Sequence, residues 1–227
     1  MSTSLVTINL VVLNGEKYIR HCLDAVLAQT YPHENIEINI LDNNSTDNTK
    51  SIVKDFGFRI SDFGFTRFNF VESKLNLGVW PGQEELLKHT NGQYVVALCV
   101  DVLMDKDFIK NAVETMEKDE KIGALQPKIY KFELSNLQPT TYNLQPKIID
   151  TCGFKIFKSR RIVNIGHGLS FAEASAFSKL SANRSEGKGF NFDKQQEIFA
   201  VEGAVPVFRK EALESCRVSL PAYQLTS

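Results

Sequence analysis

Clusters of hydrogen-bonding side chains directly follow three apolar segments of this chain. They are Asn14, Gly15 and Glu16 after residues 5–13, Asp42, Asn43, Asn44 and Ser45 after residues 36–41, and Asp101 after residues 93–100. Carboxylates and amides in such places can bind a ribose, a base, or a metal ion that is held on a phosphate group. The alternative for each cluster is a turn that only caps the following helix.

An alternation of apolar strands and amphipathic helices would bring these clusters together. Strands are predicted at residues 5–13, 36–41, 66–72 and 93–100, and helices within residues 14–32, 45–57, 83–92 and 105–119. This alternation is typical of an α/β fold with a doubly wound, mostly parallel sheet flanked by helices. Ligands of such sheets bind outside the carboxyl ends of the strands, so we expect the three clusters at one edge.

Several turns can be predicted from single residues. Ser45 or Thr46 is predicted as the N-cap of the second helix. Residues 75–82 are predicted as a loop. Asp105-Lys106-Asp107 has the spacing of a metal-binding pair. It directly precedes a predicted helix, so we favour Asp105 as an N-cap and Asp107 as a charge that complements the helix dipole.

The regular alternation ends after about residue 120. Residues 147–166 are predicted to form a β-hairpin that turns near Lys158-Ser159, and residues 197–213 a strand followed by a helix. The basic side chains at the hairpin tip are expected to be solvated, and contact with an anionic lipid-linked acceptor is the alternative. They are Lys158, Arg160 and Arg161.

The composition excludes several classes of protein. A net charge of −1 provides no overall field that would attract nucleic acid. No segment approaches the roughly 18 apolar residues of a membrane-spanning helix. The four cysteines form no C-x-x-C pair, which predicts reduced core thiols in a cytoplasmic protein. The first cluster lacks the glycine pattern with which a dinucleotide-binding unit binds a pyrophosphate. Asp42 could still bind a ribose or base, and a metal ion held by Asp101 could bind the phosphates.

These residues carry a resemblance to a known family. The opening VTINLVVLNGEKYIRHCLDAVLAQTYPHENIEINILDNNSTDNT resembles family 2 glycosyltransferases with the GT-A fold. The later segments NLG, NGQYVVALCVDVLMDKDFI, IGALQPKI, IIDTCGF and VEGAVPVFRKEAL follow in the same order. The similarity is to the rhamnosyltransferase-like branch of cell-surface polysaccharide synthesis. It implies one GT-A domain over residues 1–227, in which residues 1–120 bind a nucleotide sugar and residues 121–227 form the acceptor side.

The resemblance also implies a role for individual residues. Asp42 corresponds to the aspartate that binds the nucleotide base, and Asp101 to the last aspartate of the DxD motif, which holds Mn²⁺ or Mg²⁺ on the donor diphosphate. Cys99 stands at the first position of that motif. The other residues expected to bind the donor nucleotide are Asn14, Glu16, Asn43 and Ser45, with Asn76 and Gly78 in a loop that closes over it. An ordinary turn is the alternative for Asn76 and Gly78.

The implied activity is inverting transfer of a sugar from a nucleotide sugar to a glycan or lipid-linked acceptor. The enzyme would be cytoplasmic, with peripheral association at the inner face of the membrane, and would have no nucleic-acid partner. In the family the catalytic base lies beyond the region that corresponds to residues 203–213, and only ESCRVSLPAYQLTS follows here. We therefore expect the chain to end before the base, and we assign no catalytic residue. The alternative function is a catalytically incomplete sugar-nucleotide-binding fragment or scaffold.

Overall fold

The chain folds into two compact units. The computed structural model describes residues 4–133, 148–170, 173–174, 192 and 194–216. The described residues up to 125, together with those from 203 onward, form the first unit, and the described residues between 126 and 202 form the second. The tail beyond residue 216 and the polar segment at 134–147 lie outside the described residues.

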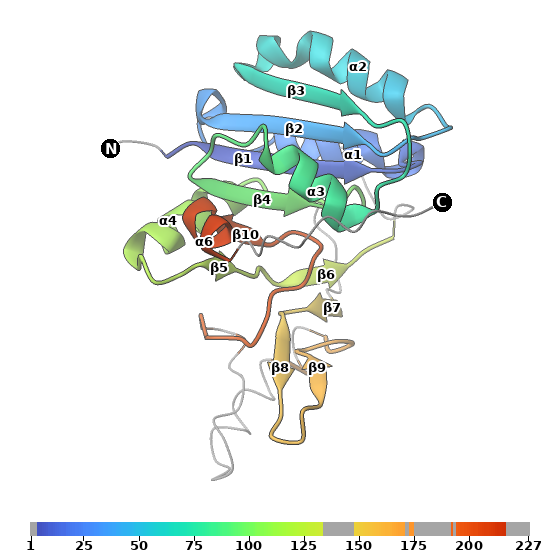
Figure 1. Ribbon diagram of the computed structural model, residues 1–227. Coiled ribbons are helices and arrows are strands. Elements are labelled where there is room, and N and C mark those ends of the chain that lie inside the picture. The colour runs from blue at the N-terminus through green and yellow to red at the C-terminus, as the bar shows by residue number, and fades with distance from the viewer. Residues whose placement is uncertain (1–3, 134–147, 171–172, 175–191, 193, 217–227) are drawn as a thin grey trace. The chain divides into compact units, whose positions relative to one another are not determined.

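The first unit alternates strands and helices along the chain (Figure 1). Its elements are β1 (Val6–Val12), α1 (Glu16–Leu27), η1 (His33–Asn35), β2 (Ile36–Asp42), α2 (Thr49–Arg59), η2 (Ile60–Phe63), β3 (Arg67–Glu72), α3 (Val79–Leu87), β4 (Tyr94–Leu98), α4 (Phe108–Lys118), β5 (Ala124–Leu125), β10 (Val207–Arg209) and α6 (Lys210–Ser215). The sheet order is β3-β2-β1-β4-β10-β5. Strands β3, β2, β1 and β4 are parallel, while β10 is antiparallel to both of its neighbours. The predicted α/β fold with a mostly parallel sheet is confirmed.

Helices cover both faces of this sheet. Successive strand residues point to opposite faces. The face toward α1 carries Val12, because a Cβ on Gly15, the residue before α1, would lie 2.5 Å from the Val12 side chain. The opposite face carries Val11, because a Cβ on Gly82 of α3 would lie 2.9 Å from the Val11 side chain. All seven residues of β2 are buried, as expected of a central strand between two helical layers.

Three helices begin at residues other than those predicted. Helix α2 begins at Thr49 with Asn48 as its N-cap residue, so the N-cap prediction for Ser45 or Thr46 is wrong. Helix α3 begins at Val79, directly after Gly78, which has a φ of 86°. Pro81 is tolerated there because the first helical turn needs no N–H from it. Helix α4 begins at Phe108, and Asp107 rather than Asp105 is its N-cap residue.

The second unit contains short antiparallel pairs. Strand β6 (Ile129–Lys131) pairs with β7 (Ile148–Thr151), and β8 (Phe154–Ile156) pairs with β9 (Ile162–Asn164). The predicted hairpin and its turn near Lys158 are therefore confirmed, but its first predicted strand is divided in two. A small core supports this unit, consisting of Ile149, Cys152, Ile165, Ala174 and Phe192.

The cysteines differ from one another in environment. All four are free thiols, but only Cys22 and Cys152 are buried, and Cys216 is exposed, which corrects the expectation of a core thiol there. Burial raises the pKa of the Cys152 thiol to about 11. Burial, reinforced by the nearby Cys99 and Asp101, raises the pKa of Cys22 further. In the described part of the chain, no helix combines the length and apolar character that are needed to span a bilayer.

Candidate functional site

The carboxyl ends of three neighbouring strands bring the predicted residues to one edge of the sheet. Strand β1 lies between β2 and β4 and is parallel to both, with Val12 opposite Asp42 and Leu10 opposite Leu98. Asp42 therefore ends β2 beside the loop that begins at Asn14, and Asp101 follows β4 on the other side. The strand order reverses between β1 and β4, where open α/β sheets bind their ligands.

Asp42 is the most deeply buried acid of this edge, with none of its surface exposed. Its Oδ2 accepts a 3.0 Å hydrogen bond from the Ser45 N–H and lies 3.6 Å from Lys50 Nζ. Its Oδ1 is buried and has no hydrogen-bond partner among the described residues. An unpaired buried acceptor costs about 1–3 kcal/mol, so a hydrogen-bond donor on a ligand would be stabilised there.

Lys50 is a residue that the sequence analysis missed. Its side chain is about two-thirds buried, and its ammonium group faces the carboxylate of Asp42. Its position in the sequence could have indicated this contact. Lys50 lies in the first turn of α2, eight residues beyond the end of β2, and a long side chain can reach back from there to the strand. Lys50 therefore places a positive charge opposite the buried carboxylate of Asp42.

Asn14 and Ser45 join the loops that follow β1 and β2. The Asn14 N–H donates to Ser45 Oγ at 2.9 Å, and the Thr46 N–H donates back to Asn14 Oδ1 at 2.8 Å. Asn14 has a φ of 49°, a left-handed conformation that asparagine adopts more readily than most residues. Both predicted donor-binding residues therefore determine the shape of this edge.

Glu16 continues the same junction between the two loops. Its carboxylate accepts hydrogen bonds from the Asn48 backbone N–H at 3.2 Å and the Asn48 side chain at 2.7 Å. Its own N–H donates to Asp47 Oδ2 at 3.0 Å. The Glu16 carboxylate is thus engaged within the protein, at the start of α1.

Asp47 and Thr49 hold the start of α2 and were also missed. Asp47 Oδ1 accepts the Thr49 N–H at 3.0 Å and the Thr49 hydroxyl at 2.5 Å, while Thr49 Oγ1 accepts the Gly15 N–H at 2.8 Å. Desolvation alone would raise the pKa of Asp47, but the hydrogen bonds from Thr49 and the Glu16 N–H outweigh it and lower that pKa. Asp47, the residue before the N-cap Asn48, therefore supplies the side-chain acceptor that was predicted to come from Ser45 or Thr46.

Asn43 connects the end of β2 to the loop before α3. Its Nδ2 donates to Asn76 Oδ1 at 2.8 Å and to the Gly78 carbonyl at 3.3 Å, and its Oδ1 accepts the Leu77 N–H at 2.8 Å. Asn76 Oδ1 also accepts the Gly78 N–H at 2.9 Å, so Asn76 and Gly78 form a side-chain-closed turn. The predicted loop is thereby held over the end of β2.

Asp101 is free to bind a cation. Its side chain is exposed, and it forms no hydrogen bond or ion pair with the described residues. Its turn lies next to the β1 loop, because a Cβ on Gly15 would be 3.0 Å from the Val100 side chain. The described residues contain no group of three metal-ligating side chains. Asp101 therefore fits an ion that takes most of its ligands from phosphate and water, as Mg²⁺ commonly does.

The alternative pair, Asp105 and Asp107, is occupied at the start of α4. Asp105 Oδ1 accepts the Asp107 N–H at 3.0 Å, and Asp107 Oδ1 accepts the Thr30 hydroxyl at 2.6 Å. Gln29 Oε1 accepts the Ile109 N–H at 3.1 Å, which satisfies another free donor of the first turn. The preference for a helix-start role over metal binding agrees with these contacts.

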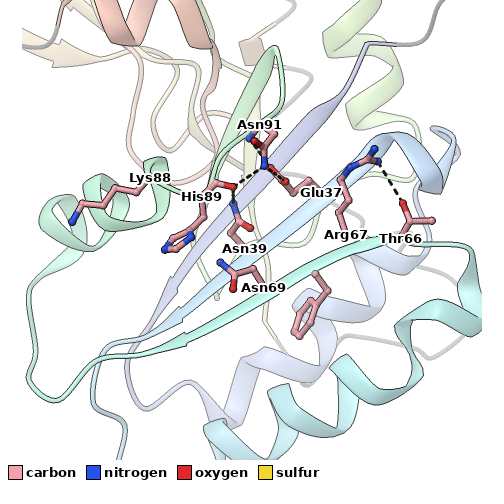
Figure 2. Close-up of a pocket in the computed structure, with 9 residues that line it drawn as sticks. Glu37, Asn39, Thr66, Arg67, Asn69, Lys88, His89 and Asn91 are labelled. Atoms are coloured by element: carbon pink, nitrogen blue, oxygen red, sulfur yellow. Dashed lines mark hydrogen bonds between the residues drawn. The ribbon is translucent and has the colours of Figure 1, made fainter.

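A hollow of about 440 Å³ lies at the opposite end of β2 (Figure 2). Its lining includes Glu37, Asn39, Arg67, His89 and Asn91. Figure 2 shows the Glu37 and Asn91 side chains pointing toward each other, and they are joined at 2.7 Å. Glu37 also accepts the Thr7 hydroxyl and the Asn91 N–H, at 2.6 and 2.8 Å. These bonds hold the turn before β4, so we assign the hollow a structural role.

Comparisons with known proteins agree with this geometry. Residues 7–214 match the family described as Glycosyl transferase family 2. A relative from Methanococcus voltae, a dolichyl N-acetyl-alpha-D-glucosaminyl phosphate 3-beta-D-2,3-diacetamido-2,3-dideoxy-beta-D-glucuronosyltransferase, is 30% identical over 52% of this chain and 36% of its own length. The poly-beta-1,6-N-acetyl-D-glucosamine synthase of Staphylococcus epidermidis is 30% identical over 49% of this chain and 25% of its own length. The chain thus spans about a third or less of these relatives.

Solved structures share the fold. The mannosyltransferase PcManGT from Pyrobaculum calidifontis, in complex with GDP-Man and Mn²⁺, superimposes with a TM-score of 0.53 and 26% identity over 58% of this chain and 37% of that one. Staphylococcus aureus TarS 1-349 in complex with UDP superimposes with a TM-score of 0.51 and 20% identity over 62% of this chain and 40% of that one. The GT-A fold that was expected from the sequence is confirmed.

Proposed function

Because the chain belongs to glycosyl transferase family 2, we propose that it binds a nucleotide sugar at the edge formed by β1, β2 and β4 and transfers the sugar in polysaccharide synthesis. The observation that carries the proposal is the buried Oδ1 of Asp42 at the end of β2, which has no hydrogen-bond partner in the described part of the chain. We assign residues 1–120 to donor binding and residues 121–227 to the acceptor side.

Asp42 would recognise the base through an N–H group. A carboxylate oxygen only accepts hydrogen bonds, so it favours uracil, thymine or guanine, each of which carries a ring N–H. Adenine and cytosine present a lone pair at the corresponding ring nitrogen, and this lone pair would be repelled by the carboxylate oxygen of Asp42. The GDP-Man of the Pyrobaculum calidifontis mannosyltransferase agrees with this selection.

The other residues of the edge would shape the pocket around the nucleotide. Asn14 and Ser45 hold the two loops together, and Asn43 holds Asn76 and Gly78 where they can cover the base or ribose. Glu16 would help to shape the pocket by holding Asn48 rather than by contacting the nucleotide.

Asp101 would hold Mn²⁺ or Mg²⁺ against the diphosphate. When bound there, the ion would supply positive charge to the departing nucleoside diphosphate. The acceptor hydroxyl would attack the anomeric carbon with inversion while the bond to the phosphate oxygen breaks and a carboxylate removes the hydroxyl proton. We assign no residue of this chain to that last role.

A polysaccharide or lipid-linked acceptor would place the enzyme in the cytoplasm at the inner face of the membrane. The relatives support this class of acceptor, since one is a poly-beta-1,6-N-acetyl-D-glucosamine synthase and another acts on a dolichyl phosphate sugar. The second candidate function is a sugar-nucleotide-binding module without turnover. It would depend on the same edge.

Calorimetry with nucleoside diphosphates tests the proposal. With Mn²⁺ present, UDP, dTDP or GDP should bind more tightly than ADP and CDP. Asp42→Asn should weaken binding of the preferred nucleotide by about tenfold or more, because a hydrogen bond to a charged acceptor is worth roughly 1.5–3 kcal/mol. Asp55→Asn, an exposed change on α2, should bind normally. Equal affinity for all five nucleotides, or unchanged affinity in Asp42→Asn, would contradict the assignment. Binding without sugar transfer would favour the second candidate.

A further inference from the structure

The tip of the β8–β9 hairpin exposes eight consecutive residues. This hairpin tip is Lys155–Ile162, with the sequence KIFKSRRI, and each of its residues is exposed. Four residues are basic, three are large and apolar, and the eighth is a serine. No acidic residue occurs in the sequence between Asp150 and Glu173. The segment therefore combines concentrated positive charge with apolar surface in water.

The backbone holds the apolar side chains in fixed positions. Ile156 and Ile162 are directly paired across the two strands, so their side chains share one face. They are 41% and 55% exposed. The turn is closed by the Phe157 N–H, which donates to the Arg161 carbonyl at 2.9 Å, and by the Arg160 N–H, which donates to the Phe157 carbonyl at 2.8 Å.

The cationic groups surround the remaining apolar side chain. Phe157 is 43% exposed. Lys155 Nζ lies 5.4 Å and the Arg161 guanidinium 5.6 Å from the centre of its ring. Within the described residues, none of the four basic side chains of the hairpin tip forms an ion pair with a carboxylate. Their charges remain available to an anionic partner.

We propose that the hairpin tip binds the surface of an anionic lipid bilayer. The side chains of Ile156, Phe157 and Ile162 would enter the boundary between headgroups and acyl chains, and the basic groups would contact lipid phosphates. A soluble polyanion such as nucleic acid would satisfy the charges but leave the isoleucine pair in water. The bilayer alone matches both properties, and this inference stands independently of the proposed function.

Vesicle sedimentation of the full chain tests the proposal. The protein should sediment with vesicles of equimolar phosphatidylcholine and phosphatidylglycerol and remain in solution with phosphatidylcholine alone. Binding should weaken between about 0.1 M and about 1 M salt, because the Debye length falls from roughly 10 to 3 Å. Absence of binding to the anionic vesicles would overturn the proposal.

Two variants separate the charge from the apolar contribution. Each basic residue near an anionic surface contributes about 1 kcal/mol, or about fivefold, so K158Q/R160Q/R161Q should bind on the order of 100-fold more weakly. The control R20Q/K110Q/K121Q removes the same charge from exposed positions of the first unit and should bind normally. I156S/I162S keeps all charges and should also bind more weakly. Circular dichroism would verify that every variant retains its fold.

The opposite results are equally informative. If the charge control loses as much binding as the hairpin variant, the interaction is non-specific and the proposal fails. If I156S/I162S binds as the parent does and single-stranded DNA displaces the vesicles, the hairpin tip is a polyanion site rather than a membrane site.

Discussion

Asn43 and Asn76 are joined side chain to side chain by a 2.8 Å hydrogen bond between Nδ2 and Oδ1. The first residue follows β2 and is only 2% exposed, while the second lies 33 positions later in an exposed loop. Together with the bonds from Asn43 to Leu77 and Gly78, this contact fixes the loop above the end of β2. A loop held at both the strand and the helix can cover a ligand with little loss of conformational entropy.

Asn43→Ala should release that loop. Three hydrogen bonds are lost, so hydrogen exchange at residues 75–78 should accelerate and the affinity for the nucleotide should fall about tenfold. The free energy of unfolding should fall by about 1–3 kcal/mol, because Asn43 is buried. Asn111→Ala, an exposed change on α4, is the matched control. If exchange at residues 75–78 does not change in Asn43→Ala, the loop is held by other contacts.

Asp101→Asn should uncouple nucleotide binding from the metal. The parent protein is expected to bind its nucleotide more tightly with Mn²⁺ than with a chelator, and the variant should lose most of this difference because a neutral amide binds Mn²⁺ poorly. Asp105→Asn should keep the metal effect and lose about 1 kcal/mol of stability, since it weakens the turn before α4. If Asp105→Asn loses the metal effect and Asp101→Asn keeps it, Asp105 rather than Asp101 binds the metal ion.

Asp47 should make stability depend on pH in a definite direction. Its pKa is lowered in the folded protein, so its contribution is present above the unfolded pKa of about 4 and is lost as the pH falls toward the folded value. Asp47→Asn should therefore be less stable than the parent near pH 7, by about 1 kcal/mol. Urea titrations should show this difference shrinking below about pH 4, whereas the exposed change Asn111→Ala, which removes no titratable group, should show no such trend.

Gly92→Ala should destabilise the turn before β4. A Cβ there would lie 2.5 Å from the Thr7 backbone nitrogen and 2.9 Å from the Leu5 carbonyl oxygen, and backbone atoms cannot easily move away. We expect a loss of about 1–3 kcal/mol in the free energy of unfolding. Gly123→Ala, whose Cβ would meet only the Ala212 methyl at 3.3 Å, should cost less. Equal losses of unfolding free energy in the two variants would mean that the turn at Gly92 can shift to accommodate the Cβ.

The strands were predictable because each is an apolar run bounded by polar residues. Residues 5–13, 36–41, 66–72 and 93–100 correspond to β1, β2, β3 and β4 within two residues at each end. Helix starts were less predictable. Ser45 looks like an N-cap locally, but its hydroxyl accepts the Asn14 N–H, and the side chain of Asp47, the residue before the N-cap Asn48, accepts the first N–H of α2 instead. The competing partner lies 31 residues away in the sequence, so no local rule could include it.

The sequence by itself determined the order of strands and helices, the family, and the acids at the strand ends, because periodicity and residue type are local properties. Only the tertiary structure decided which polar groups are already paired. It engaged Asn14, Glu16, Asn43 and Ser45 in contacts between loops. It left Asp101 exposed, and it buried Asp42 Oδ1 without a hydrogen-bond partner among the residues that the structure describes. Whether a polar group has a hydrogen-bond partner depends on residues that are distant in the sequence and adjacent only in the folded chain, so the sequence alone could not predict it.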